Sequence, residues 1–234
     1  MGHIIVFEFT PAAVIVLLIT DTSHALPVQV LRNGGVVVMP TDTVYGLTCS
    51  INRHDAINRI YKLKDMDPKK PLSILVGDMS AVGKYAKGVS TPAFRILKRV
   101  LPGPYTFIFE ATSEVPKIML RKRRTIGVRM PDNPITLALL AELDEPLLTT
   151  SVRTPDDQWV IDALEIESTL DQRVDVVVDG GPLVATPSTV VDLSGDVRTL
   201  QVDLSGHALP LGTQAFPRGD VDRLVAEGEK VGLL

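Results

Sequence analysis

The chain has 234 residues and a formal net charge of −4, and 45% of its residues are hydrophobic, 22% charged and 5% aromatic. This composition is typical of a soluble globular protein, and the length suits one large α/β domain or one domain with an appendage. The single cysteine, Cys49, excludes an intramolecular disulfide and favours a reducing compartment. The four histidines are scattered, which excludes the HExxH and Cys/His metal-binding patterns.

The charges are unevenly distributed along the chain. Residues 53–129 carry 17 basic and 6 acidic residues, whereas residues 130–234 carry 6 basic and 19 acidic ones. Such a division favours one face that attracts anions such as phosphate or nucleic acid. A solvated basic face without a partner is the alternative.

The N-terminal segment is strongly apolar but does not have the pattern of a signal peptide. No Lys or Arg precedes it, and Glu8 and Pro11 interrupt it. It is also shorter than the roughly 20 residues that a membrane span needs. We therefore expect a strand at Ile4–Phe9, a buried helix at Pro11–Ile19 and a cytoplasmic protein.

The segment Val36–Leu47 begins as a buried strand and ends as a hydroxyl-rich turn. Its β-branched start follows the breaker Gly34-Gly35, and Pro40 cannot donate to a sheet ladder. Four polar residues then crowd into five positions: Thr41, Asp42, Thr43 and Tyr45. Polar groups just beyond a central strand are typical of ligand sites in α/β sheets, but they also suit an ordinary Asx/Thr turn. The nearby Cys49 is interpreted as structural rather than as a nucleophile, because no histidine lies at a recognisable spacing.

The rest of the chain alternates between predicted helices and strands. Helices are predicted at Asn52–Lys64 (capped by Asn52 or Asp55), Asp78–Lys87, Thr91–Leu101 (capped by Thr91), Ser113–Arg121, Asn133–Leu143 and Ile161–Leu170, with a further one at Val221–Glu227. Strands are predicted at Leu72–Val76, within Leu101–Phe109, at Thr125–Met130, Pro146–Ser151 and Val174–Asp179, and as a hairpin of 185–192 with Val197–Val202. The alternation favours one α/β sheet with helices on its faces.

Three hydroxyl clusters and two cations are candidates for one ligand site. The clusters lie at predicted strand ends: Thr41/Thr43, Thr149/Thr150/Ser151 and Thr186/Ser188/Thr189. Lys64 and Arg129 would neutralise charge in the same space, as in phosphoryl or nucleotidyl transfer. Arg129 is placed either to fork onto a carboxylate or phosphate, or to pair with a neighbouring acid. No Walker A or GxGxxG motif occurs, so a nucleotide site would be of another type.

These motifs resemble the YrdC/YciO family from about Gly34 to Asp192. The resemblance rests on Pro40-Thr-Asp-Thr-Val-Tyr-Gly-Leu47, Lys64…Lys70-Pro-Leu72, Pro102-Gly-Pro-Tyr-Thr106, Gly127-Val-Arg-Met-Pro131, Pro146–Ser151 and Pro187-Ser-Thr-Val-Val-Asp192. It implies a single three-layer α/β domain with a twisted mixed sheet and a concave, positively charged cleft. We expect this domain to span residues 1–205, with a tail of unknown role at 206–234.

The resemblance also implies a reaction and its substrates. The family makes threonylcarbamoyl-AMP from L-threonine, bicarbonate and ATP, with Mg²⁺ carried on the ATP phosphates, to modify tRNA to N6-threonylcarbamoyladenosine. It has also been linked to double-stranded RNA. By this resemblance, Thr41, Thr43, Tyr45 and Thr149 would line the threonine pocket, and Arg129 would hold the threonine carboxylate. The nucleotide would contact Lys64, also the expected catalytic residue, together with Ser151, Arg153 and Ser188.

Two departures separate this sequence from the synthases. Met66 stands where a Lys-x-Arg pair expects arginine, and Arg153 stands where a Ser-x-Asn pair expects asparagine. Met66 and the basic run 121–129 resemble the YciO branch more than the YrdC branch. A synthase-like enzyme, a nucleotide- or double-stranded-RNA-binding protein with weak or no synthase activity, and a relic of the fold therefore remain as alternatives.

Overall fold

A computed structural model describes most of the chain. Residues 24–67, 70, 72–120, 123–154, 156–170, 173–184 and 186–194 are described in full, and 15–18, 197–201 and 214–217 by their backbone alone. The predictions for Ile4–Phe9 and Val221–Glu227 lie outside these residues.

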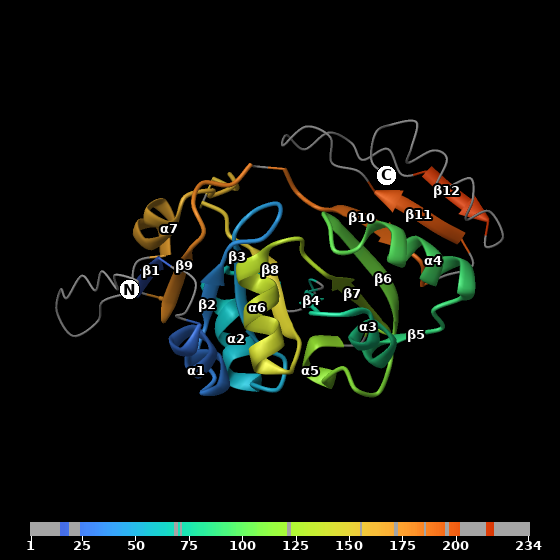
Figure 1. The fold of residues 1–234 in the computed structure, drawn as a ribbon, viewed down its shortest axis with the longest axis horizontal. Helices are drawn as coiled ribbons and strands as arrows, with labels where there is room; N and C mark the ends of the chain where they lie inside the picture. Colours follow the sequence, from blue (N-terminus) through green and yellow to red (C-terminus); the bar gives the residue numbers. More distant parts are fainter. Residues whose placement is uncertain are drawn as a thin grey trace.

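The described strands form one mixed, twelve-stranded sheet (Figure 1). Its order is β1-β9-β2-β3-β8-β4-β7-β6-β10-β11-β12, and β5 pairs with β6 outside this path. The strands are β1 (Ile15–Leu18), β2 (Val37–Met39), β3 (Gly46–Ser50), β4 (Ser73–Leu75), β5 (Ala86–Lys87), β6 (Tyr105–Ala111), β7 (Thr125–Arg129), β8 (Leu147–Ser151), β9 (Val176–Asp179), β10 (Thr189–Asp192), β11 (Val197–Gln201) and β12 (Gln214–Pro217). Parallel pairs such as β4 with β7 stand beside antiparallel pairs such as β3 with β8, so the predicted single α/β sheet is confirmed.

Helices cover both faces of the sheet. They are α1 (Ala25–Arg32), α2 (His54–Leu63), α3 (Met79–Tyr85), α4 (Thr91–Val100), α5 (Lys117–Leu120), α6 (Pro134–Leu143) and α7 (Ala163–Leu170). In β2, Val37 and Met39 belong to a core cluster with α1 and α6, whereas Val38 belongs to a larger cluster with the other five helices. Because successive side chains of a strand point to opposite faces, α1 and α6 cover one face and the remaining helices cover the other.

Helices α1 and α6 leave part of their face of the sheet uncovered. The candidate site lies on that part. Along β8, Leu147 packs against these helices, but Thr149 and Ser151 follow on the same face. Thr149 is in register with Ser73 of β4, and Ser73 is in register with Gly127 of β7. Apolar side chains therefore give way to hydroxyls and glycine where the helices end.

Several predicted elements are confirmed with shifted ends. The strand after Gly35, the helices α2 and α6, the strands β7 and β8, and the β10–β11 hairpin lie where the sequence places them. Asn133 caps α6 by accepting a hydrogen bond from Thr136 N at 3.1 Å. The predicted caps of two other helices are wrong. Ser90, not Thr91, caps α4, and α2 begins after Arg53 without a side-chain cap.

Two predicted helices are wrong in kind or in length. Within Pro11–Ile19, Ile15–Leu18 forms β1, parallel to β9, because a continuous apolar run suits a buried strand as well as a buried helix. Of Ser113–Arg121, the described residues 113–120 contain only the short helix α5, which starts directly after Pro116. The sequence interpretation did not anticipate α1, β3, β5 or β12.

Candidate functional site

The turn between β2 and β3 is organised by its own hydroxyl groups. Thr41 Oγ1 donates to the carbonyl oxygen of Val44 at 2.6 Å and accepts from the backbone N–H of Thr43 at 3.2 Å. The hydroxyl oxygens of Thr41 and Thr43 lie 3.1 Å apart. Both threonines are buried, so the turn is a fixed wall rather than a solvated loop.

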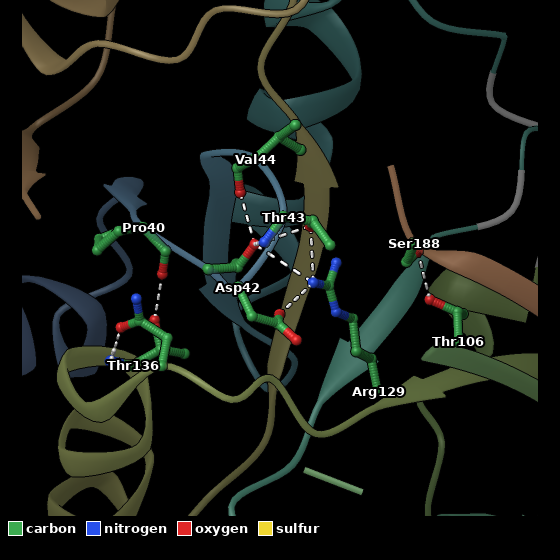
Figure 2. Close-up of polar contacts among 10 residues, drawn as sticks. Pro40, Asp42, Thr43, Val44, Thr106, Arg129, Thr136 and Ser188 are labelled. Carbon is green, nitrogen blue, oxygen red and sulfur yellow. Dashed lines mark hydrogen bonds and ion pairs between the residues drawn. The ribbon is translucent and has the colours of Figure 1, made fainter. Parts of the chain in front are cut away.

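Arg129 ends β7 and points into this turn (Figure 2). Its Nη2 donates to Thr43 Oγ1 at 2.7 Å, to Thr41 Oγ1 at 3.4 Å and to the carboxylate of Asp42. Burial lowers the pKa of the Arg129 guanidinium from its ordinary value, and the Asp42 carboxylate acts in the opposite direction. The structure thus contains the pairing of Arg129 with a neighbouring acid, one of the two alternatives that the sequence left open.

A cavity of about 190 Å³ lies next to Arg129. Its lining is mostly small and hydroxyl-bearing: Thr41, Thr43, Val44, Tyr45, Gly46, Leu72, Ser73, Thr106, Arg129, Thr149, Thr150, Ser151, Trp159, Pro187 and Ser188. Thr106 and Ser188 face each other with hydroxyl oxygens 3.0 Å apart (Figure 2). A Cβ at Gly46 would lie 2.7 Å from Thr149 Oγ1, so glycine is required for this close approach. We call this space the hydroxyl cavity.

Tyr45 lines the hydroxyl cavity, but its hydroxyl group is bound elsewhere. It donates to the carbonyl oxygen of Gly181 at 2.8 Å and accepts from the N–H of Gly180 at 3.1 Å. Burial of the ring raises the pKa of Tyr45 to about 12, so the phenol stays protonated at neutral pH. Tyr45 therefore connects the threonine-rich turn to the chain that leaves β9.

Lys64 lies around the end of β8, in a second cavity of about 590 Å³. We call it the basic cavity because four cations line it, although three aspartates lie among them. Its lining is Leu47, Leu63, Lys64, Asp65, Met66, Asp67, Lys70, Val152, Arg153, Thr154, Asp157, Thr169, Leu170 and Arg173. Lys64 Nζ donates to the carbonyl oxygen of Ser151 at 2.5 Å and to Thr150 Oγ1 at 3.3 Å. Burial, followed by the nearby cations Lys70 and Arg153, lowers the pKa of Lys64 to about 8.

Arg153 and Trp159 separate the two cavities. The Cζ atom of Arg153 lies 3.6 Å from the centroid of the Trp159 ring, and its Nη1 is 2.6 Å from Asp157 Oδ2. Trp159 lines the hydroxyl cavity and Arg153 lines the basic cavity, where the partly buried Met66 also lies. The guanidinium of Arg153 is therefore present on the Lys64 side, where Met66 provides no charge.

The structure divides the predicted site residues into two groups. Those around the hydroxyl cavity are Thr41, Thr43, Tyr45, Arg129, Thr149, Ser151 and Ser188, whereas Lys64 and Arg153 lie in the basic cavity. Lys64 and Arg129 therefore do not share one space, although the consecutive residues Ser151 and Val152 line one cavity each.

Sequence reasoning missed Ser73, Thr106 and Gly127 as parts of this site, and it did not single out Asp42 as the partner of Arg129. In β4, β6 and β7 these small residues stand on the uncovered face, where alternation would otherwise place apolar side chains. A small or polar residue where the alternation of a strand predicts an apolar one is the signal that could have identified these positions.

Other chemistry is limited in the described part of the chain. Cys49 is fully buried, and burial raises the pKa of its thiol to about 12, which fits the structural interpretation. Among the described residues there is no cluster of His, Cys, Asp or Glu that could hold a metal ion. Nor does that part of the chain contain a helix long and apolar enough to span a membrane.

Comparisons with known proteins give consistent matches. A family model for Sua5, YciO and YrdC, described as "Telomere recombination", matches residues 29–202. YciO of Escherichia coli strain K12 is 41% identical over 185 residues, which cover 78% of this chain and 89% of YciO. A threonylcarbamoyl-AMP synthase of Mus musculus is 34% identical over 171 residues, covering 70% of this chain and 60% of the synthase.

Solved structures agree with these matches. The crystal structure of E. coli YciO has a TM-score of 0.72 at 34% identity, and the match covers 86% of this chain and 94% of YciO. P. abyssi Sua5, in a complex with L-threonine, has a TM-score of 0.72 at 27% identity, and the match covers 76% of this chain but only 53% of Sua5. The chain therefore matches nearly all of YciO and about half of Sua5.

Proposed function

The chain belongs to the Sua5, YciO and YrdC family, and from this premise we propose that it is a threonylcarbamoyl-AMP synthase-like enzyme that uses L-threonine, bicarbonate and ATP. The observation that carries the proposal is the hydroxyl cavity with Arg129 at its wall. A guanidinium beside several hydroxyl groups suits the carboxylate and hydroxyl of a small amino acid such as threonine. That a family member of known structure is complexed with L-threonine supports this choice of ligand.

The two cavities suggest how the substrates divide. In the proposal, Arg129 holds the threonine carboxylate, while Thr41, Thr43 and Thr149 surround the threonine side chain. ATP lies across the end of β8 with its phosphates toward Lys64 and Arg153, and Ser151 and Ser188 contact the nucleotide. ATP would carry Mg²⁺ on its phosphates.

The proposed chemistry needs positioning and charge more than a covalent intermediate. The threonine amine adds to the carbon of bicarbonate and water leaves, which gives an N-carboxylate. An oxygen of that carboxylate attacks the α-phosphorus of ATP, and pyrophosphate leaves. Negative charge develops on the phosphates during this step, and the cations Lys64 and Arg153 would stabilise it from the basic cavity. Arg153 would thereby supply the positive charge that Met66 lacks.

The test is synthesis of the adenylate in vitro. We expect the protein, with ATP, Mg²⁺, labelled bicarbonate and L-threonine, to release pyrophosphate and form labelled threonylcarbamoyl-AMP. Arg129→Gln should abolish product formation by removing the carboxylate contact, whereas Arg95→Gln on the exposed face of α4 should leave it unchanged. Absence of product at high enzyme concentration would overturn the proposal.

A second candidate is a nucleotide- or double-stranded-RNA-binding protein with weak or no synthase activity. Met66 and a group of exposed cations favour it; on and beside α3, α4 and α5 these are Lys84, Lys87, Arg95, Lys98, Arg99, Lys117, Arg123 and Arg124. Such a surface would bind RNA with an affinity that falls steeply as salt rises. RNA binding without adenylate synthesis would favour this candidate, and absent or salt-independent RNA binding would count against it.

A further inference from the structure

The hydroxyl cavity contains one charge in its wall. Among the described residues that line it, Arg129 is the only one with a charged side chain. Asp42 does not line the cavity, but its carboxylate forms an ion pair with Arg129 Nη2. Figure 2 shows the Asp42 carboxylate and the Thr43 hydroxyl reaching the same nitrogen of the guanidinium. A ligand in the cavity therefore meets the Arg129 cation, whose charge is balanced by a carboxylate outside the lining.

The charge of Asp42 is balanced by Arg129 and by no other described side chain. The Asp42 side chain is 10% exposed and the Arg129 side chain 9%. Asp42 Oδ2 and Arg129 Nε are both buried and have no hydrogen-bond partner within the described part of the chain. Because both charges are shielded from water, each of them acts on a nearby ligand more strongly than it would at the surface.

We infer that Asp42 determines the charge of the ligand that the hydroxyl cavity accepts, so that the site selects a zwitterionic amino acid over a simple carboxylate. The inference rests on the proposed function, since it takes the cavity as the amino-acid site. Arg129 alone would attract any small carboxylate, including those that lack an amino group. With Asp42 beside it the pair is neutral, so an anion without an amino group gains little, whereas a zwitterion brings its own positive charge and leaves the occupied site neutral.

A purely structural role of Asp42 gives a different expectation. If Asp42 only held Arg129 in place, removing its charge would weaken every ligand to a similar degree. If it sets the charge of the site, removing its charge should strengthen anions while it weakens or spares the zwitterion. The ratio of two affinities therefore separates the two roles.

Three ligands of similar shape and different charge make the test. L-threonine is a zwitterion, 3-hydroxybutyrate is the anion without the amino group, and 1-amino-2-propanol is the cation without the carboxylate. Calorimetric titration of the wild-type protein should rank threonine first. Asp42→Asn keeps the shape and removes the charge, and we expect it to tighten 3-hydroxybutyrate relative to threonine by at least about tenfold, the order of effect of one partly buried charge at close range.

A second variant keeps the test decisive if Asp42→Asn does not fold. Arg129→Gln leaves the Asp42 carboxylate unbalanced, so it should lose 3-hydroxybutyrate and gain 1-amino-2-propanol relative to the wild type. Circular dichroism and thermal melting identify folded variants. An equal change for all three ligands in the folded variants would overturn the inference. Failure of the wild-type protein to bind threonine would instead count against the proposed function. The affinities of Asp42→Asn and the wild type for 3-hydroxybutyrate and 1-amino-2-propanol can still be compared in that case, and an unchanged ratio of these two affinities would overturn the inference.

Discussion

At the scale of single residues, the hydroxyl groups around Arg129 have two tasks. Thr41 and Thr43 fix the turn through bonds to its backbone and to each other, and they also accept hydrogen bonds from the guanidinium. A buried arginine needs such acceptors because unpaired polar groups are costly away from water. The same acceptors leave Arg129 in place before any ligand binds, which lowers the cost of ordering the site.

Lys64 provides the first residue-scale prediction, a dependence of ATP binding on pH. Because its pKa is lowered to about 8, Lys64 is charged at pH 7.5 and mostly neutral at pH 9. The attraction for phosphate is thus present below pH 8 and lost as pH rises above it. We expect the affinity for ATP to fall roughly five- to tenfold between pH 7.5 and pH 9, in proportion to the charged fraction.

The control for this prediction is Lys64→Arg, which keeps its charge throughout that range. Calorimetric or fluorescence titration with ATP should then show little change with pH, and Trp159 beside the hydroxyl cavity provides an intrinsic fluorophore. An equal pH dependence in the wild type and in Lys64→Arg would show that another group titrates.

Tyr45 provides the second residue-scale prediction. Tyr45→Phe removes a buried hydroxyl that bonds to the backbone of Gly180 and Gly181. The loss leaves two backbone groups without their partner and should cost about 1–3 kcal/mol of unfolding free energy. Thermal melting should detect a lower midpoint, by about 2–4 °C for each kcal/mol in a protein of this size. Tyr105→Phe is a control, since the described contacts of Tyr105 include no hydrogen bond from its hydroxyl. A fall in melting temperature that is the same in both variants would contradict this role of Tyr45.

At the scale of elements, the start of α6 supports the site without touching the cavity. Thr136 is fully buried, and its hydroxyl donates to the carbonyl oxygen of Pro40, the residue before the threonine-rich turn (Figure 2). Asn133 caps the same helix end through its side chain. Thr136 therefore holds the turn, whereas Asn133 stabilises only the helix.

This arrangement predicts that two substitutions in α6 will differ in effect. Thr136→Val keeps the shape but leaves Pro40 O unpaired in the core, so the turn should loosen and threonine should bind several-fold more weakly. Asn133→Ala loses a cap worth about 1 kcal/mol of stability and should leave threonine affinity close to the wild type. Titration and melting of both proteins check the contrast. Equal affinities in the two variants would contradict a role of α6 in positioning the turn.

Most elements could be predicted because their local signals were strong. Asn133-Pro134 marks the start of α6 unambiguously, and the apolar face of α2 has clear helical spacing. By contrast, β1 could not be separated from a helix, because a continuous apolar run has no periodicity that distinguishes the two. The strand β3 was missed because a glycine at position 46 is also typical of the end of a turn. The close approach of Gly46 to Thr149 on β8 depends on the tertiary structure, so the sequence alone does not show it.

For the site, sequence reasoning identified residues but not their grouping. It placed Lys64 and Arg129 in one space because both were candidate cations for the ligand site formed by the hydroxyl clusters. In the fold, Lys64 comes from the layer of α2 and reaches the end of β8 from the opposite face of the sheet. Thr106 and Gly127 belong to motifs of the resemblance but were not singled out as site residues, and Ser73 belongs to none of those motifs. Only the pairing of β4, β7 and β6 brings the three together.

At the scale of the whole molecule, one short connection crosses the site. Strands β9 and β10 are consecutive in the chain, yet six strands separate them in the sheet. The described residues of the connection, 180–184 and 186–188, include Pro187 and Ser188 of the hydroxyl cavity, and Figure 1 shows these two segments in orange at the upper edge of the sheet. We call this connection the strap.

The length of the strap constrains the shape of the sheet. Seven steps between strands at about 4.8 Å amount to about 34 Å in a flat sheet. The ten residue steps from Asp179 to Thr189 reach at most about 33–36 Å when fully extended. The strap also bends at Gly181, which has a φ of +81°, so it could not span a flat sheet. Twist of the sheet must bring β9 and β10 closer together, with the cavity beneath the strap.

A longer strap should therefore open the cavity without unfolding the protein. Insertion of Gly-Ser after Val184, which is 78% exposed, would release the constraint on Pro187 and Ser188. Because Ser188 would then leave Thr106, we expect threonine affinity to fall several-fold, while the melting temperature changes little, since lengthening a surface connection by two residues costs only tenths of a kcal/mol. The same insertion after Gly88, in an exposed connection far from the cavity in sequence, is the matched control. If both insertions leave threonine binding unchanged, the length of the strap does not determine the shape of the site. The contacts of the turn with Arg129 would then be sufficient to maintain the cavity.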